Sequence, residues 1–165
     1  MLHETGLVLS VGGINVDQEN SLEKKLDRVK TAVWQYIREN LLMIDILKSK
    51  KQTHETIEKI FDLYEMSLNL ALQYRVNIPL IDVTSGYLDF LIKHRKYNRY
   101  VEVSEVFRGY VKGLALDNPR YMENYIAICK EMGELYQALS FCFDPKYIEL
   151  ADVCFDEVAK ANKNT

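Results

Sequence analysis

The chain has 165 residues, of which 48% are hydrophobic and 27% are charged, and this composition is typical of a folded domain rather than a disordered chain. A chain of this length buries enough surface to fold without a disulfide or a metal ion. Its formal net charge of −3 gives it no overall attraction for nucleic acid or for an anionic membrane. It contains no uninterrupted apolar segment long enough to span a bilayer, so we expect no membrane partner.

Residues 1–20 are expected to form an N-terminal tail or a short docking segment. Within them, Leu7 to Val11 is apolar, but no cluster of basic residues precedes it and two glycines follow it, so it does not have the pattern of a secretory signal. We expect at most one short strand in this stretch. Residues 21–165 are expected to form a single all-helical domain.

Two long helices are predicted first. Asn20 is predicted to cap the first of them, with Glu23 reaching back to the cap. Apolar residues then recur at helical spacing and mark one stripe: Leu22, Leu26, Val29, Val33, Tyr36 or Ile37, Leu41, Ile44 and Leu47. Thr53 is predicted to cap a second helix, which runs to about Arg75 and is apolar on two faces. Because a short turn joins them, the two helices predict an antiparallel hairpin.

A capping residue followed by proline occurs three times, which predicts three further helix starts. The three marks are Asn77-Ile78-Pro79, Asp117-Asn118-Pro119 and Asp144-Pro145. Asn98 is predicted to cap another helix between the first two marks, so a helical hairpin repeats along the chain. On that helix, Gly109 and Gly113 lie four residues apart, which predicts the close approach of a neighbouring helix.

Gly133 is predicted to end the fifth helix, with a sixth helix running through Ala138 and Phe141. The segment Lys130 to Phe141 resembles the turn between the two helices of a tetratricopeptide repeat, because Gly133, Leu135 and Ala138 fit the small, large apolar and alanine positions of that turn. This resemblance implies an α-solenoid that binds a peptide or a protein. The predicted fold class is therefore all-α, with antiparallel helical hairpins packed as a short α-solenoid-like array or as a plain helical bundle.

No catalytic motif is present, since the sequence lacks a glycine-rich phosphate loop, HExxH and GxSxG. We therefore expect neither enzymatic activity nor a cofactor. His54, Glu58 and Asp62 share one face of the second helix and could bind a cation. Such a row near a helix start is more typical of a solvated surface that complements the helix dipole, so we expect no metal site there.

The three cysteines occur without a CxxC arrangement, at Cys129, Cys142 and Cys154. Each lies in an apolar helical segment, which predicts reduced residues in the core. Reduced cysteines are typical of a reducing compartment, and the predicted location is therefore the cytoplasm.

A compact basic turn is predicted between the third and fourth helices, where the cations from Lys93 to Arg99 are interleaved with Tyr97 and Tyr100. Cations beside aromatic rings can bind an acidic peptide, a terminal carboxylate, or the phosphates and bases of a single-stranded nucleic acid. The candidate partner-binding residues belong to this turn and to the tyrosine-rich helix faces: Lys93, Arg95, Lys96, Tyr97, Arg99, Tyr100, Tyr110, Tyr121 and Tyr125.

These features predict a non-enzymatic protein-protein interaction, adaptor or scaffold module that binds a partner segment on a helical groove. The expected partner is a protein or an acidic peptide. Two alternatives remain open: a nucleic-acid-associated helical subunit that uses the basic turn at 93–99, and a helical small-molecule sensor whose ligand lies among Tyr and Phe side chains. The acidic balance of the whole chain argues more strongly against nucleic acid than against a protein partner.

Overall fold

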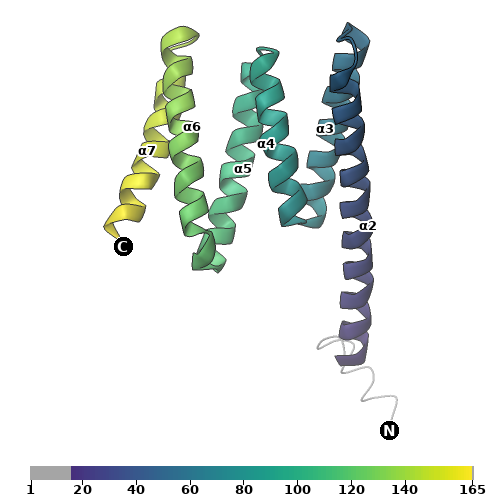
Figure 1. Ribbon diagram of the computed structural model, residues 1–165. Coiled ribbons are helices and arrows are strands. Elements are labelled where there is room, and N and C mark those ends of the chain that lie inside the picture. The colour runs from purple at the N-terminus through teal and green to yellow at the C-terminus, as the bar shows by residue number, and fades with distance from the viewer. Residues whose placement is uncertain (1–15, 165) are drawn as a thin grey trace. The chain divides into compact units, whose positions relative to one another are not determined.

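The computed structural model describes residues 16–164, and within this range the chain is all-α, as predicted. Six α-helices follow one another in this range: α2 (Val16–Ser49), α3 (His54–Tyr74), α4 (Asn77–Lys93), α5 (Tyr97–Asp117), α6 (Met122–Cys142) and α7 (Tyr147–Lys163) (Figure 1). A short 3₁₀ helix, Pro119–Tyr121, precedes α6. The described residues contain no strand, and the strand expected at Leu7 to Val11 lies outside them.

The chain divides into two compact units, Met1–Tyr87 and Leu88–Thr165, and the boundary falls within α4. The first unit contains α2, α3 and the N-terminal part of α4. The second unit contains the last turns of α4 together with α5, α6 and α7. None of the helices between residues 16 and 164 has both the length and the apolarity that crossing a bilayer requires.

In the first unit, α2 and α3 pack against each other as the predicted hairpin. Ile37 and Ile44 of α2 and Ile60 of α3 are buried in this contact. Between them, Asn40 Nδ2 donates a hydrogen bond of 3.1 Å to Ser67 Oγ, so these buried polar side chains of the two helices satisfy each other. This pairing also fixes which residues of α2 and α3 lie at the same level.

One helix boundary of the first unit follows the sequence and another departs from it. Thr53 caps α3 as predicted, because its Oγ1 accepts a hydrogen bond of 3.1 Å from the Thr56 N–H. However, α2 begins before Asn20, so the prediction that Asn20 caps it is wrong. Asp17 and Glu19 lie in the first turn, where carboxylates complement the positive end of the helix dipole and favour this earlier start.

In the second unit, α6 is one continuous helix, so the predicted turn at Gly133 is wrong. Gly133 is buried within α6, and a Cβ atom there would lie 2.8 Å from Cε1 of Phe155 on α7. The glycine therefore permits close packing of two helices instead of ending one. The segment Lys130 to Phe141 is helix interior and not a turn, and Phe141 is exposed near the end of α6.

The capping of a helix start by Asn118 is confirmed, whereas Asp144 makes a similar hydrogen bond just before α7, whose cap position is Lys146. Asn118 Oδ1 accepts a hydrogen bond of 3.1 Å from the Arg120 N–H, and Asp144 Oδ1 accepts one of 3.0 Å from the Lys146 N–H. At the remaining mark, α4 already begins at Asn77, which therefore lies inside the helix instead of capping it. The three proline marks therefore lie close to helix starts, but only Asn118 caps a helix with its side chain as predicted.

Two predictions for α5 are wrong. Asn98 lies inside the first turn of α5 instead of capping it, and its Oδ1 accepts a hydrogen bond of 3.1 Å from the Tyr147 hydroxyl on α7. The side chain thus joins two helices. Gly109 and Gly113 are exposed, and a Cβ atom on either would meet no other atom within 4 Å. Within residues 16–164, no helix approaches α5 at these two glycines.

Candidate partner-binding surface

The turn between α4 and α5 holds the basic residues in a defined backbone conformation. Arg95 has a φ of 57°, in the left-handed region. Its N–H donates to the Ile92 carbonyl at 3.0 Å, and the Lys96 N–H donates to the Leu91 carbonyl at 2.9 Å, which is the hydrogen-bond pattern of a Schellman motif. This geometry ends α4 sharply and leaves the side chains of Arg95 and Lys96 exposed.

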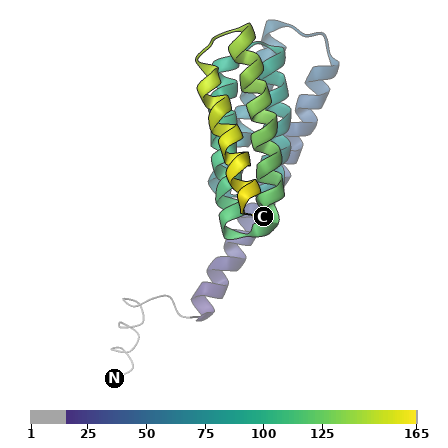
Figure 2. The same ribbon diagram turned by 90° about the vertical axis from the view of Figure 1, so that its left-hand side faces the viewer.

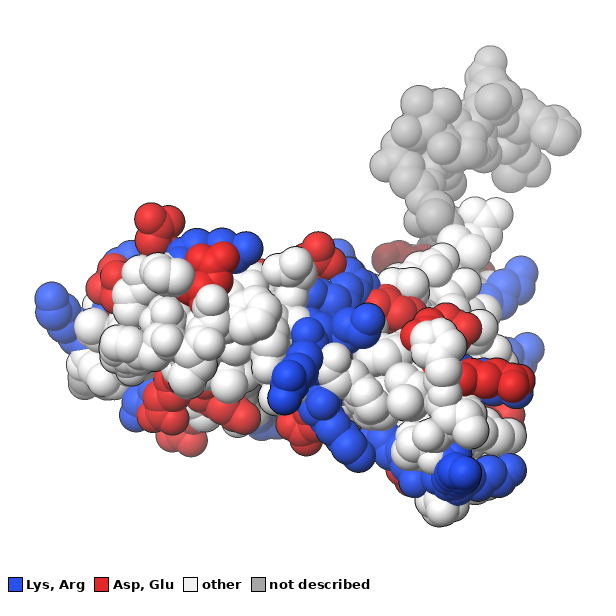
Figure 3. Space-filling model, turned by 90° about the horizontal axis from the view of Figure 1, so that it is seen from above, with Lys and Arg blue, Asp and Glu red and all other residues white. Residues whose placement is uncertain are grey.

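Three cations at this turn are available to a ligand. Lys93, Arg95 and Lys96 are exposed, and none of them forms an ion pair with a carboxylate among residues 16–164. Arg99 differs, because its Nη1 lies 2.8 Å from Glu102 Oε2 and its charge is partly neutralised. Figure 3 views the molecule from above, the end at which this turn lies, and shows Lys and Arg side chains gathered there.

The turn between α6 and α7 brings an aromatic surface to the same end of the second unit. The rings of Tyr97 and Phe143 meet edge to face with 4.5 Å between their centroids. Phe143 is 62% exposed and was not predicted as a site residue. The sequence shows that Phe143 directly precedes Asp144 and Pro145, but it does not show that Phe143 contacts Tyr97. We call Lys93, Arg95, Lys96, Tyr97 and Phe143 the basic-aromatic end.

His94 lies within the same turn and packs on Phe90, with 4.3 Å between the ring centroids. Burial lowers the pKa of His94, and the positive charges of Lys93 and Lys96 lower it further. The imidazole is therefore neutral at neutral pH. An anionic ligand beside the two lysines would offset part of this effect.

The predicted tyrosines do not form one surface. Tyr100 and Tyr125 are buried, so they support the core. Tyr110 and Tyr121 are half-buried, and Tyr121 lies in the 3₁₀ helix beyond the far end of α5 from Tyr97. At a rise of 1.5 Å per residue, α5 separates Tyr121 from the basic turn by about 30 Å. Only Tyr97 among the predicted tyrosines remains beside the exposed cations.

A second basic turn, which was not predicted as a site, lies between α2 and α3 in the first unit. Lys50 and Lys51 are exposed there. The neighbouring Lys48 is engaged, since its Nζ lies 2.8 Å from the Tyr64 hydroxyl. This turn therefore offers two cations and no exposed aromatic ring, in contrast to the basic-aromatic end.

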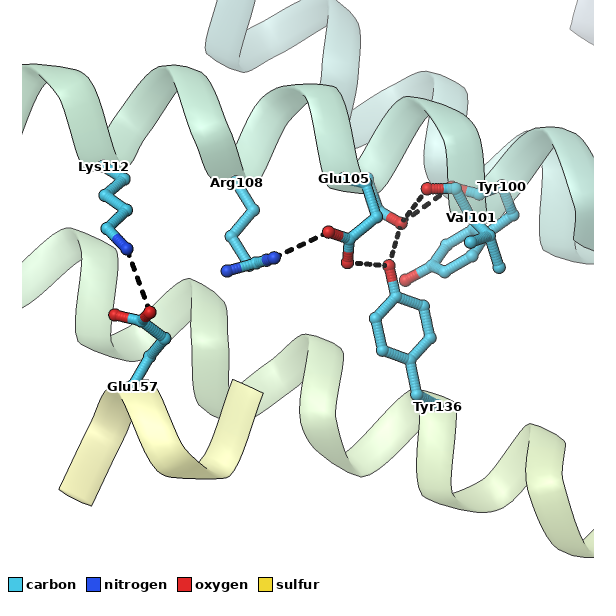
Figure 4. Close-up of polar contacts among 8 residues, drawn as sticks. Tyr100, Val101, Glu105, Arg108, Lys112, Tyr136 and Glu157 are labelled. Atoms are coloured by element: carbon cyan, nitrogen blue, oxygen red, sulfur yellow. Dashed lines mark hydrogen bonds and ion pairs between the residues drawn. The ribbon is translucent and has the colours of Figure 1, made fainter. Parts of the chain in front are cut away.

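The polar network inside the second unit joins helices (Figure 4). The Tyr136 hydroxyl donates to Glu105 Oε1 at 3.0 Å and lies 2.6 Å from Ser104 Oγ. Glu105 Oε2 in turn lies 2.7 Å from Arg108 Nη2. Because each charge meets a partner from the protein itself, the network stabilises the contact of α5 with α6 rather than presenting groups to a ligand.

A second ion pair extends this contact to α7. Lys112 Nζ of α5 lies 2.9 Å from Glu157 Oε1 of α7 (Figure 4). The hydrogen bond from Lys112 is the main cause of the lowered pKa of Glu157. The carboxylate therefore remains ionised at neutral pH and keeps its partner.

The two buried cysteines are not activated as nucleophiles. Cys129 and Cys154 are free and buried, as predicted, whereas Cys142 is exposed at the end of α6, so its predicted core position is wrong. Burial raises the pKa of Cys129 and raises that of Cys154 to about 11. Both buried thiols are protonated at neutral pH and react slowly. Within residues 16–164, no group of three or more His, Cys, Asp or Glu side chains is arranged to hold a metal ion.

Comparison of the chain with protein-family models, with curated proteins and with solved structures finds no significant match.

Proposed function

We propose that the chain is a non-enzymatic interaction module whose basic-aromatic end binds an acidic segment of a partner protein. The observation that carries this proposal is that three exposed cations have no carboxylate partner among residues 16–164 and adjoin a pair of aromatic rings. Carboxylates of a ligand would accept hydrogen bonds from Lys93, Arg95 and Lys96. An apolar side chain of the ligand would pack on Phe143, which supplies exposed apolar area.

Arg95 adopts a left-handed backbone conformation at the end of α4. A left-handed residue at a helix end is usually glycine, and a larger residue there costs about 1 kcal/mol. Arg75 at the end of α3 has the same conformation, with a φ of 52°, and is also exposed. Arg75 therefore serves as a matched control for Arg95, because charge reversal at either position changes the same side chain on the same backbone.

A protein partner fits this surface better than nucleic acid. The affinity of a nucleic-acid site grows with the number of phosphates that the protein neutralises. The basic-aromatic end offers three unpaired cations on one short turn, in a chain with a net charge of −3. Three cations can pair with the few carboxylates of a short acidic peptide, whereas on a nucleic acid they would neutralise only about three phosphates.

The test is binding of a fluorescein-labelled peptide of alternating Glu and Tyr, measured by anisotropy. We expect the double variant Arg95→Glu with Lys96→Glu to weaken binding by about tenfold at low salt, and Arg75→Glu to leave it unchanged. Circular dichroism checks that each variant is folded. Equal binding by the wild type and the double variant would contradict the proposal. Tighter binding of a labelled single-stranded DNA at the same residues would support the nucleic-acid alternative instead.

A further inference from the structure

The N-terminal half of α2 carries an apolar stripe that α3 does not cover. Leu22, Leu26 and Val29 are 50%, 49% and 42% exposed, respectively. Because Asn40 pairs with Ser67 and the helices run antiparallel, the last residue of α3, Tyr74, lies level with Val33. The part of α2 before that level extends beyond α3, as Figures 1 and 2 show.

This stripe continues a helix contact that already exists. Leu22, Leu26, Val29 and Val33 are spaced by four, three and four residues, which is the spacing of a coiled-coil seam. Further along the same face, Ile37 is 0% and Ile44 is 1% exposed because α3 covers them. The N-terminal half therefore presents the same kind of surface that α3 covers in the C-terminal half. We call residues 22–33 of this face the open seam.

The charges beside the open seam define the chemistry of an occupant. At 100° per residue, Glu23 and Lys30 flank the seam on one side and Lys25 flanks it on the other. None of these three side chains forms an ion pair within the described chain. A helix lying on the seam would therefore gain from acidic residues beside Lys25 and Lys30 and from a basic residue beside Glu23.

A second copy of the chain does not satisfy these conditions. In a parallel pair of open seams, Lys25 of each copy would lie beside Lys30 of the other, which is repulsive. In an antiparallel pair, Leu26 would lie opposite Val29 of the second copy, which places Glu23 favourably beside Lys30. In that register, however, residues 16–21 of one copy lie level with the last turns of α3 in the other copy. They would occupy the face of α2 that α3 already covers, so the two copies would clash.

We propose that the open seam binds an amphipathic helix of a partner protein, which runs antiparallel to α2 in line with α3 and carries acidic residues beside Lys25 and Lys30. The free length of α2 accommodates a helix of about 25 Å, since each residue adds 1.5 Å. The pairing extends the contact between α2 and α3 by a helix that the described chain does not supply. This site lies in the first unit and does not depend on the basic-aromatic end.

The test uses two labelled helical peptides of identical composition with the full-length chain. The matched peptide has Leu along its seam, Glu opposite Lys25 and Lys30, and Lys opposite Glu23; in the swapped peptide these charges are exchanged. We expect the matched peptide to bind about tenfold more tightly at low salt, with the ratio falling towards one in high salt. The double variant Lys25→Glu with Lys30→Glu is expected to reverse the preference, which a purely structural role of the lysines would not produce.

Two further variants locate the site. Leu26→Glu is expected to abolish binding of the matched peptide. Leu42→Glu replaces an exposed leucine on the opposite face of the same helix and is expected to leave binding unchanged. Equal loss in both variants would overturn the proposal. So would a wild-type chain that binds neither peptide, or one that forms a dimer, measured by sedimentation velocity, which Leu26→Glu dissociates.

Discussion

The two halves of α2 have the same apolar spacing but different surroundings. In the C-terminal half, Ile37 and Ile44 are buried under α3, whereas Leu22 and Leu26 in the N-terminal half remain about half exposed. The difference follows from length, because α2 has 34 residues and α3 has 21. Periodicity determines that a segment forms a helix and which face is apolar. Whether that face is covered depends on the extent of a neighbour elsewhere in the sequence.

The largest expected effect tests this difference directly. Ile44→Ala removes a buried side chain and leaves a cavity, so we expect it to lower the free energy of unfolding by about 3 kcal/mol. Leu26→Ala removes a side chain that is already half exposed, and we expect a loss of about 0.5 kcal/mol. Urea denaturation of both variants measures the two values. A loss at Leu26 as large as that at Ile44 would show that the N-terminal half is covered in the folded chain.

The glycines of the second unit repeat the comparison between covered and uncovered helix faces. Gly133 lies against the ring of Phe155, whereas Gly109 has no neighbour where its side chain would be. We expect Gly133→Val to destabilise by about 2 kcal/mol, because the new side chain overlaps that ring. Gly109→Ala is expected to stabilise by about 0.5 kcal/mol, because alanine reduces the freedom of the unfolded chain and the site is open.

Thermal unfolding followed by circular dichroism separates these two glycine effects. The expected shifts of the melting temperature have opposite signs, downward for Gly133→Val and upward for Gly109→Ala. The double variant Gly133→Val with Phe155→Ala provides a control, because removing the ring makes room for valine. If that double variant were no more stable than the sum of its single changes predicts, the ring would not be the cause.

Local signals in the sequence predicted much of this fold. Thr53 and Asn118 act through hydrogen bonds to residues two or three positions away, so their effect is readable from neighbouring residues. The predictions that Gly133 ends a helix and that Asn98 caps one are wrong because the partners of both residues lie on α7, far along the sequence. A glycine either ends a helix or admits a neighbour, and asparagine either caps a helix or joins two, and local sequence does not distinguish these roles.

The candidate site shows the same limit. The exposure of Lys93 and Lys96 was predictable, since charged side chains at a turn remain in water. The burial of Tyr100 and Tyr125 was not, because it depends on the packing of α5 and α6. Phe143 joins the surface only through the meeting of two turns distant in sequence. The open seam was visible as part of a stripe, but its exposure depends on where α3 ends.

The smallest expected effect is a dependence of peptide binding on pH. It should be present for binding at the basic-aromatic end and absent for binding at the open seam. The pKa of His94 in the folded chain is lowered below 6.5, first by burial and then by Lys93 and Lys96. An acidic peptide bound to these lysines would raise this pKa again, so binding takes up protons and its affinity rises as the pH falls through the region just below 6.5. We expect the Glu-Tyr peptide to bind about threefold more tightly at pH 5.5 than at pH 7.5.

His94→Gln should remove this dependence on pH while retaining binding at pH 7.5, where the imidazole is already neutral. The matched helical peptide on the open seam should show no such dependence in the same range, because the glutamates of the peptide titrate near pH 4.3. The free chain is expected to lose stability as the pH falls below 6.5, since the unfolded state then binds the proton more readily than the folded state. Binding of the Glu-Tyr peptide that strengthened equally in the wild type and in His94→Gln would place the titrating group elsewhere and separate His94 from the basic-aromatic end.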